Sequence, residues 1–396
     1  MQATLRRLPR AGRQSSSGPY RRDAVTWAAF GALFAFGFLN AVLGPALPYI
    51  RATEGISYVV GALHQAAYAL GGGLAGLFAA RERFALSRAA VIATGLAGAA
   101  LAAAAVAYGD VAAITISGAL IMSLLGTSAL IRVWAALSDV HGARRAVAMT
   151  EGEVSVSLAG IVAPALIGVL ATTSLSWRFA LVIGGATAVL AGLTVWRVGM
   201  PPPAGRPIDG PAGAIGAHGW RQPTLIVVFA IVGLEFSLSF WLASYLHDDV
   251  GIAPEAAVAT VSGLYAANLA GRLLVSRLAR RASPERLLVA SLGTALVGLP
   301  ILLLADNLVL AGLGIGVAGI GIGAMFPLTS SVHVKASGRG ADSALGQVLT
   351  VAALGQMAGP LSAGVIAQGA GLRSGLLVLP ALTIVAAIAL CCHRAS

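Results

Sequence analysis

Residues 91–106 read VIATGLAGAALAAAAV, a stretch without a charged side chain. Its apolar residues do not alternate with polar ones, whereas the strands of a membrane β-barrel alternate over segments of about ten residues. Inside lipid, every backbone N–H and C=O must be satisfied within the segment, which leaves an α-helix. The stretch therefore predicts a helix that crosses a membrane, over residues 88–108.

The same apolar character extends over most of the chain. Its 396 residues are 58% hydrophobic and only 10% charged, with a mean hydropathy of +0.86. A soluble domain carries about 25% charged residues, so most of this chain cannot face water. Apolar segments long enough to span a bilayer, about 20 residues each, recur twelve times in the sequence. We predict helices at residues 25–48, 57–79, 88–108, 112–136, 147–171, 177–198, 224–246, 256–276, 286–305, 308–332, 343–367 and 373–392.

The basic residues indicate how the chain is oriented. With the N-terminus inside, 21 of the 26 lysines and arginines lie on the cytoplasmic side. Arg51, Arg178 and Arg373 lie outside, and Arg132 and Arg272 lie within spans. Short cytoplasmic loops retain Lys and Arg, so we expect a multi-pass protein of the cell inner (plasma) membrane with both termini in the cytoplasm. These arginines alternate with spans and form no stripe with aromatic residues, so we expect no nucleic-acid partner.

Two segments lack membrane character. Residues 1–24 predict a disordered basic cytoplasmic tail, although a mitochondrial transit peptide has a similar composition. Residues 199–223 are rich in Pro and Gly and predict a cytoplasmic linker. Cys391 and Cys392 are adjacent, a spacing that suits neither a disulfide framework nor a metal site. We expect no metal and no cofactor, and palmitoylation of these cysteines is a minor alternative.

The linker divides the chain into two six-span bundles, residues 25–198 and 224–393. Features of the first half recur in the second, and four offsets in register indicate homologous halves. The pairs, separated by 195, 196, 195 and 198 residues, are Arg144 and Arg339, Pro164 and Pro360, Arg178 and Arg373, and Gly73 and Gly271.

With these features the chain resembles the major facilitator superfamily of secondary transporters, over all but its tail. The resemblance rests on the glycine-rich exits of spans 2 and 8 into basic loops and on the glycine–proline pattern of span 11. Residues of these motifs, to which the resemblance assigns a gating role, are Gly73, Gly76, Arg81, Gly271, Arg272, Arg277, Arg281, Gly359 and Pro360. The chain departs from the family where Ala80 replaces a signature aspartate, and where the antiporter-like pattern stands in span 11 and only a degraded version in span 5.

The resemblance implies an all-α fold of twelve transmembrane helices in two pseudo-symmetric six-helix bundles around a central cavity. The bundles would rock to expose this cavity to each side in turn. By the same analogy, spans 1, 4, 7 and 10 line the cavity.

Ionisable side chains at bilayer depth are costly, so each one is a candidate for function. Glu235 lies about eleven residues, or roughly 16 Å, from either end of its span, and we expect it to accept a proton or bind substrate. A structural hydrogen bond is the alternative. Asn40 is its repeat partner at an offset of 195 residues, and either faces the cavity or joins two helices. Arg132 in span 4 binds an anionic group or extends to the cytoplasmic surface.

The remaining pathway candidates lie in spans 2 and 8. His64, Gln65 and Tyr68 occupy the outer half of span 2, with His64 and Tyr68 on one helix face, and Asn268 lies in span 8. For His64 a gate or packing hydrogen bond is the favoured role, and proton coupling, for which an imidazole is suited, is the alternative. We expect Arg272 to be structural, and Glu153, like Glu151, to stabilise the start of span 5.

Glycines spaced four apart allow helices to approach closely in lipid. This spacing predicts close approach at four pairs, which are Gly72/Gly76, Gly312/Gly316, Gly319/Gly323 and Gly355/Gly359.

We expect a monomeric secondary transporter, not an enzyme, which moves a small solute coupled to protons. The span 11 pattern favours efflux by antiport, whereas the polar set of Asn40, Gln65, Tyr68 and Asn268 would also suit uptake of a sugar or an organic anion. The alternatives from other functional classes are an intramembrane enzyme and a transporter-like membrane sensor. An intramembrane enzyme needs paired acids or a serine beside a base, and a transporter-like sensor usually adds a soluble domain. The sequence has no Walker A motif, which argues against an ATP-driven pump.

Overall fold

The computed structural model describes residues 21–81, 86–202, 222–337 and 341–395. Within these ranges every regular element is helical, and helices stand at all twelve predicted crossings. Ten of these crossings are long and apolar enough to span a membrane. Crossings 1 and 10 are each built from two helices, α1 (Ala24–Ala41) with α2 (Leu43–Glu54), and α11 (Leu308–Ile322) with α12 (Met325–Ala336). The other ten are α3 (Tyr58–Arg81), α4 (Arg88–Tyr108), α5 (Ala112–His141), α6 (Arg145–Ala171), α7 (Arg178–Val198), α8 (Pro223–Asp248), α9 (Pro254–Leu278), α10 (Pro284–Leu303), α13 (Ala341–Gly375) and α14 (Val378–Ala395).

Prolines account for both broken crossings. Pro45 has no N–H to donate to the carbonyl of Ala41, and its ring crowds that carbonyl, so α1 ends at Ala41 and α2 begins after Val42. Pro327 acts in the same way on Gly323, which lies in the gap between α11 and α12. Each break therefore frees a backbone carbonyl at bilayer depth.

The helices form two bundles with the same internal packing, α1 to α7 and α8 to α14. In the first bundle α1 packs on α6 and α7, and α5 packs on α3 and α4. The second bundle repeats this pattern, because α8 packs on α13 and α14, and α11 packs on α9 and α10. The two halves are thus pseudo-symmetric in structure, as the repeat offsets predicted.

Individual hydrogen bonds repeat as well. Arg178 Nε donates to the carbonyl of Ala107 at 2.8 Å, and Arg373 Nη2 donates to that of Ala305 at 3.1 Å. Arg178 thereby ties the beginning of α7 to the end of α4, and Arg373, which follows a kink at Gly371 and precedes α14, ties this segment to the end of α10. The basic residue at the start of spans 6 and 12 has the same structural role in both halves.

A second repeated contact joins the opposite ends of the bundles. The Thr26 hydroxyl lies 2.8 Å from His141 Nε2, and the Thr224 hydroxyl lies 2.7 Å from His333 Nδ1. All four side chains are buried. Each pair ties the first residues of α1 or α8 to the end of the fourth crossing of the same bundle. We call this side, where α1 and α8 begin, the inner side, and the opposite side the outer side.

The glycine pairs give a mixed result. Gly319 and Gly323 lie against α9, and Gly355 and Gly359 lie against α8, so close approach is confirmed there. The prediction of close approach is wrong for Gly76, Gly312 and Gly316, where a Cβ atom would meet nothing within 4 Å among the described atoms. Spacing shows that a helix can be approached on one face, and only the fold decides whether a neighbour lies there.

The repeat register around span 2 also needs correction. A Cβ atom on Gly71 would overlap the carbonyl of Leu120 on α5, and one on Gly271 would overlap that of Ile320 on α11. Gly73, which the sequence paired with Gly271, has open space around it. The structural counterpart of Gly271 is therefore Gly71.

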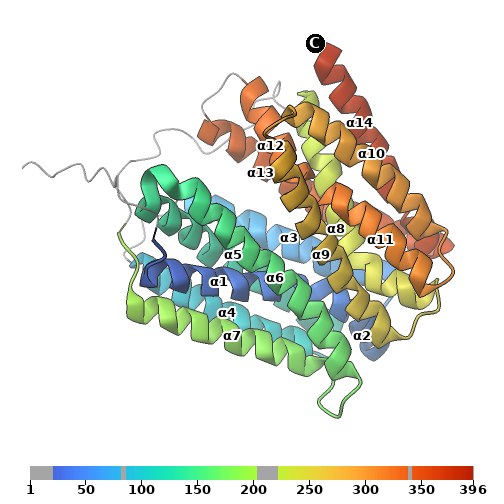
Figure 1. Cartoon of the computed structure of the whole chain (residues 1–396). Coiled ribbons are helices and arrows are strands. Elements are labelled where there is room, and N and C mark those ends of the chain that lie inside the picture. The colour runs from blue at the N-terminus through green and yellow to red at the C-terminus, as the bar shows by residue number, and fades with distance from the viewer. Residues whose placement is uncertain (1–20, 82–85, 203–221, 338–340, 396) are drawn as a thin grey trace, which may run out of the picture.

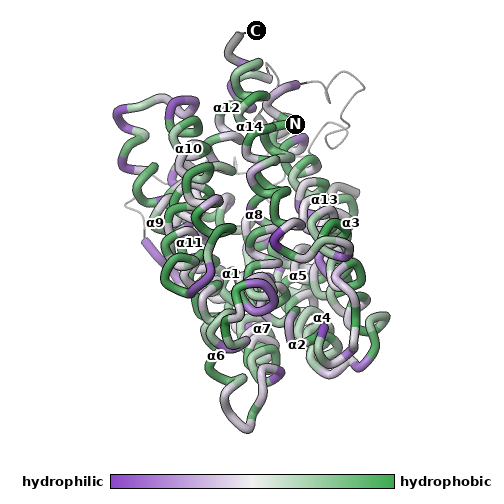
Figure 2. The backbone as a smooth tube through the Cα atoms, turned by 90° about the vertical axis from the view of Figure 1, so that its right-hand side faces the viewer, coloured by the Kyte–Doolittle hydropathy of each residue, from purple (hydrophilic) through white to green (hydrophobic). Residues whose placement is uncertain are grey.

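The two bundles meet on the outer side and diverge towards the inner side. Between them, α2 packs on α8, α3 on α13 and α6 on α9. In Figure 1 the first bundle runs across the view and the second rises steeply from it, so the beginnings of α1 and α8 lie far apart. Figure 2 shows apolar residues along the helices and hydrophilic ones mainly at helix ends and turns. Large apolar side chains such as Leu101, Leu190 and Val309 are exposed, as suits a surface covered by lipid.

Candidate functional site

A charged cluster lies where the two bundles meet, built from one residue each of α8, α9 and α6. Arg272 Nη2 lies 4.0 Å from Glu235 Oε1, and Arg272 Nη1 lies 3.5 Å from Glu153 Oε2. We call Glu153, Glu235 and Arg272 the interface triad. Its side chains are 52%, 22% and 33% exposed, respectively, so the space between the bundles reaches them from the inner side.

Arg272 is held in place by the break in crossing 10. Its Nε donates to the carbonyl of Gly323 at 2.8 Å, which is the carbonyl that Pro327 leaves without a helical partner. This bond fixes one edge of the guanidinium, while the other nitrogens face the two carboxylates. The sequence expectation that Arg272 has a structural role is therefore incomplete, because the same side chain also contacts both acids of the triad.

Glu153 is the residue of the triad that sequence reasoning missed. It lies well beyond the first turn of α6, which begins at Arg145, and the helix dipole acts only within that turn. Instead of stabilising the helix start, it faces Arg272 of the other bundle. Its depth in α6 was the available signal. Glu151, two residues earlier, pairs with Arg22 at 2.7 Å.

Tyr265 of α9 is a second residue that sequence reasoning missed. It lies within electrostatic range of Glu235 and fills the gap left by Gly160 of α6, where a Cβ atom would stand 2.8 Å from Tyr265 Cδ1. The glycine thus lets an aromatic side chain of one bundle enter the face of the other, next to the interface triad.

On the outer side the two bundles are joined by a polar cluster, which we call the outer latch. Arg51 Nη1 lies 2.8 Å from Asp248 Oδ2, and the Tyr58 hydroxyl donates to the same oxygen at 2.9 Å. The Tyr58 N–H donates to Gln368 Oε1 at 3.1 Å, and the Arg51 guanidinium stacks 3.8 Å above the Tyr58 ring. Arg51 and Tyr58 belong to the first bundle, and Asp248 and Gln368 to the second.

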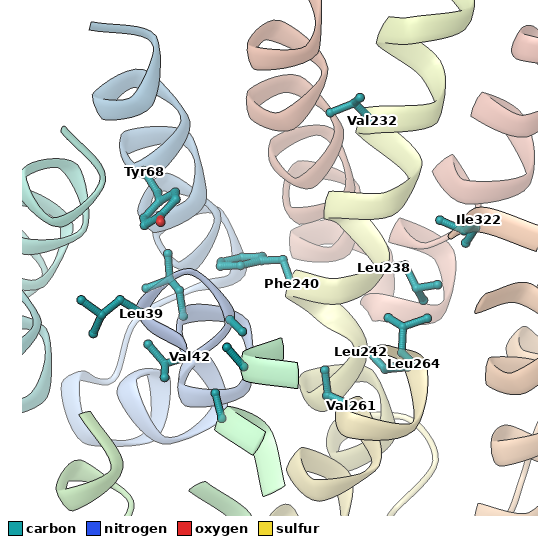
Figure 3. Close-up of a cluster of buried hydrophobic side chains, with 14 of the residues drawn as sticks. Leu39, Val42, Tyr68, Val232, Leu238, Phe240, Leu242, Val261, Leu264 and Ile322 are labelled. Carbon is teal, nitrogen blue, oxygen red and sulfur yellow. The ribbon is translucent and has the colours of Figure 1, made fainter. Parts of the chain in front are cut away.

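Beneath the latch, backbones of the two bundles touch. A Cβ atom on Gly44 of α2 would stand 2.7 Å from the Ser239 carbonyl of α8, and one on Gly364 of α13 would stand 2.8 Å from Ala62 Cβ of α3. Figure 3 shows Phe240 projecting from α8 towards the first bundle, on the side of Tyr68. The described residues therefore close the outer side and leave the interface triad accessible from the inner side.

The other pathway candidates are not all brought to the interface triad. Asn40 is half-buried at the end of α1, next to the break at Val42, and Arg132 is half-buried on α5. His64 is fully buried between α3 and α5, with Nε2 at 2.9 Å from the Thr115 hydroxyl and Nδ1 at 3.2 Å from two backbone carbonyls. Gln65 is also buried, and its Nε2 has no hydrogen-bond partner among the described atoms.

Tyr68 and Asn268 are also buried, and Tyr68 lies within electrostatic range of Tyr265 of the other bundle. Asn268 lies against Gly323, and its Oδ1 accepts no hydrogen bond within the described part of the chain. A place in the transport pathway stays a prediction for Asn40, Arg132, His64, Gln65, Tyr68 and Asn268.

The residues to which the resemblance assigns a gating role fall into four groups. Gly271 and Gly359 lie at close helix contacts, and the Pro360 carbonyl accepts a hydrogen bond from Trp241 Nε1 at 2.9 Å. Gly73 and Gly76 touch no neighbouring element of the described chain, and the side chain of Arg81 lies outside the described residues. Arg277 and Arg281 are exposed at the inner end of α9. Arg272 alone joins the interface triad.

Within the described ranges, no group of three His, Cys, Asp or Glu residues is arranged to hold a metal ion. Cys391 and Cys392 are exposed thiols at the end of α14.

Comparison with known proteins agrees with this architecture. A model of the Major Facilitator Superfamily matches residues 29–351. No curated protein matches the sequence. Among solved structures, the nucleoside transporter NupG is 16% identical with a TM-score of 0.70, and the alignment covers 94% of this chain and 98% of that one. A bacterial homologue of the human lysosomal transporter Spinster, in an inward-facing and occupied conformation, is 16% identical with a TM-score of 0.72, covering 96% and 97%. The D-xylose–proton symporter is 12% identical with a TM-score of 0.72, covering 93% and 96%.

Proposed function

The chain belongs to the major facilitator superfamily, and we propose that it moves a small solute across the membrane by alternating access, coupled to protons, with efflux by antiport as the favoured direction. The observation that carries this proposal is the interface triad. In it one guanidinium is shared by two carboxylates that belong to different bundles.

The triad offers a simple way to couple a proton to the movement of the bundles. Glu235 and Arg272 belong to the same bundle, so the energy of this ion pair does not depend on the distance between the bundles. Glu153 and Arg272 belong to different bundles, so their pairing favours the arrangement seen here. When Glu235 is ionised it competes with Glu153 for Arg272, and when it is protonated Arg272 is left to Glu153. A proton on Glu235 therefore strengthens the contact between bundles.

The same reasoning assigns roles to the two sides of the molecule. The outer latch is closed and the triad is accessible from the inner side, so this arrangement is the inward-facing one of an alternating-access cycle. We propose that the inner side faces the cytoplasm of a plasma-membrane protein, because the basic residues gather there. An even number of crossings then leaves both termini in the cytoplasm.

Uptake is a second candidate function, and the structural similarity to a D-xylose–proton symporter and to a nucleoside transporter favours it. A sugar or a nucleoside would find hydrogen-bonding partners in the accessible amide of Asn40 and in the triad. An organic anion would bind to Arg132. The direction of coupled proton movement separates uptake from efflux.

The test is transport by the purified full-length chain in liposomes that contain a pH-sensitive dye. The solutes are uridine, D-xylose, benzoate and tetraphenylphosphonium, each tested under both directions of a proton gradient. We expect one solute to move against its gradient together with a proton flux, which runs in the opposite direction for antiport. Glu235→Gln should abolish proton-driven accumulation, whereas the matched control Glu151→Gln, which removes a carboxylate outside the triad, should retain it.

Two results would contradict the proposal. If Glu235→Gln transports normally with unchanged pH dependence, the coupling site is assigned wrongly. If no solute moves with protons under either gradient, a transporter-like sensor becomes the better interpretation.

A further inference from the structure

Three arginines surround a hollow on the inner surface, at the end of α9. Arg277 lies in the last turn of the helix, and Arg280 and Arg281 lie in the turn that follows it. Together with Leu278 they line a hollow with a volume of about 380 Å³. All four residues are exposed. The family resemblance assigns a gating role to two of these arginines, Arg277 and Arg281, and the structure shows both exposed at the inner end of α9.

The described part of the chain supplies no counter-charge to these arginines. In the described ranges none of the three forms an ion pair, although acidic residues lie nearby in the sequence. Glu285, the next acidic residue along the chain, lies 3.9 Å from Lys335. Three positive charges therefore converge on one hollow with nothing in the described chain to neutralise them, which makes the hollow attractive to an anion.

An apolar strip leads from the hollow along the helix. Leu274 and Leu278 are exposed on α9, and they share one face of it with Arg277, because residues spaced by three or four lie on the same face. In the membrane this face contacts lipid acyl chains. The surface thus presents apolar side chains at the depth of the tails and guanidinium groups at the depth of the headgroups.

We infer that this hollow is a binding site for the phosphate group of an anionic phospholipid. Guanidinium groups bind phosphate oxygens through paired, charge-assisted hydrogen bonds. A zwitterionic headgroup carries its own cation and is attracted less by three arginines, whereas an anionic headgroup keeps its net charge. The continuous apolar strip favours a lipid over a free phosphate, because a soluble anion gains nothing from exposed leucines.

The experiment titrates phosphatidylglycerol or phosphatidylcholine into the full-length protein in neutral detergent and counts bound lipids by native mass spectrometry. We expect one phosphatidylglycerol molecule to bind with higher affinity than any further lipid molecules. Its affinity should fall about fivefold for each arginine removed, and so about 100-fold in Arg277→Gln/Arg280→Gln/Arg281→Gln. The matched control is Arg144→Gln/Arg145→Gln/Arg197→Gln, which removes the same charge from exposed inner positions of the first bundle and should keep the site.

Three outcomes would overturn the inference. The first is an equal loss in both triple variants, which would indicate general attraction to a basic surface. The second is unchanged binding in the α9 variant. The third is displacement of the lipid by inorganic phosphate at a similar concentration, which would indicate a site for a soluble anion. Each variant is first checked for a single monodisperse species in neutral detergent, so that misfolding is recognised before lipid is added.

Discussion

Removing the negative charge from the outer latch should shift the protein towards an arrangement that is open on the outer side. Asp248 Oδ2 lies 2.8 Å from Arg51 Nη1 and accepts a hydrogen bond from the Tyr58 hydroxyl at 2.9 Å. In Asp248→Asn the hydroxyl retains an oxygen acceptor, and the ion pair is lost. The perturbation therefore acts mainly on the charge that joins the two bundles.

The size of the effect follows from how far the pair is covered. The side chains of Arg51 and Asp248 are 18% and 24% exposed, so the pair lies between a solvent-exposed ion pair, worth roughly 0.2–1 kcal/mol, and a buried hydrogen bond to a charged group, worth roughly 1.5–3 kcal/mol. We take about 1–2 kcal/mol, which changes an equilibrium about 5- to 30-fold. The outward-open population should rise by that factor.

Cysteine labelling measures this population. Ala62 is fully buried at the contact with Gly364, so a cysteine at position 62 is reached by a membrane-impermeant thiol reagent only when the outer side opens. The background is Cys391→Ser/Cys392→Ser, which removes both native thiols. Asp248→Asn should raise the labelling rate of Ala62→Cys about 5- to 30-fold.

The control is Asp306→Asn, an exposed outer acid whose hydrogen bond to Asn307 stays within one bundle. The reasoning is refuted if Asp248→Asn leaves the rate unchanged, or if the control raises it equally. Arg51→Gln combined with Asp248→Asn should add little to either single change, because both remove the same pair.

Two further predictions concern the triad and the start of α1. Glu153→Gln should flatten the pH dependence of proton-coupled transport in liposomes, because Arg272 then has no ionised partner across the bundles, and unchanged coupling would argue against the triad mechanism. Burial acts to raise the pKa of Asp23, but hydrogen bonds from the Thr26 hydroxyl and N–H, together with the nearby His141, outweigh it and hold the pKa below its usual 3.8. Because the pKa is lowered, this N-cap stabilises the fold fully at pH values above the unfolded pKa. The stabilisation is lost as the pH falls through the folded pKa. Asp23→Ala should therefore lower the free energy of unfolding by about 1 kcal/mol near pH 7. The difference in thermal unfolding temperature between this variant and the unchanged protein should become smaller at acid pH. A difference that stays constant with pH would contradict the role of the Asp23 carboxylate as an N-cap.

Much of the fold could be predicted from local sequence. Each predicted helix is present within a few residues of its expected position, because about 20 consecutive apolar residues can satisfy their backbone in lipid only as a helix. The repeat was equally accessible. Arg178 and Arg373, paired by their offset alone, make the same bond to the end of the third crossing of their bundle.

The candidate site could be predicted only in part. Glu235 stood out because a carboxylate at bilayer depth is costly. Its partner Glu153 did not, because a short sequence distance from basic residues suggested a local role. The contact of Glu153 with Arg272 spans 119 positions of the chain, and nothing in the local pattern of either helix indicates it.

The sequence by itself determined that this chain spans a membrane twelve times, in two related halves, with most of its basic residues on one side. Only the tertiary structure decided which helix faces meet. A soluble helix shows its buried face by its apolar stripe, whereas a helix in lipid is apolar on every side. Its rotation is set by contacts such as Tyr265 in the gap at Gly160 and Gly44 against the backbone of α8. Those contacts bring Glu153 to Arg272 and leave Gly312 and Gly316, despite their spacing, without a neighbour among the described residues.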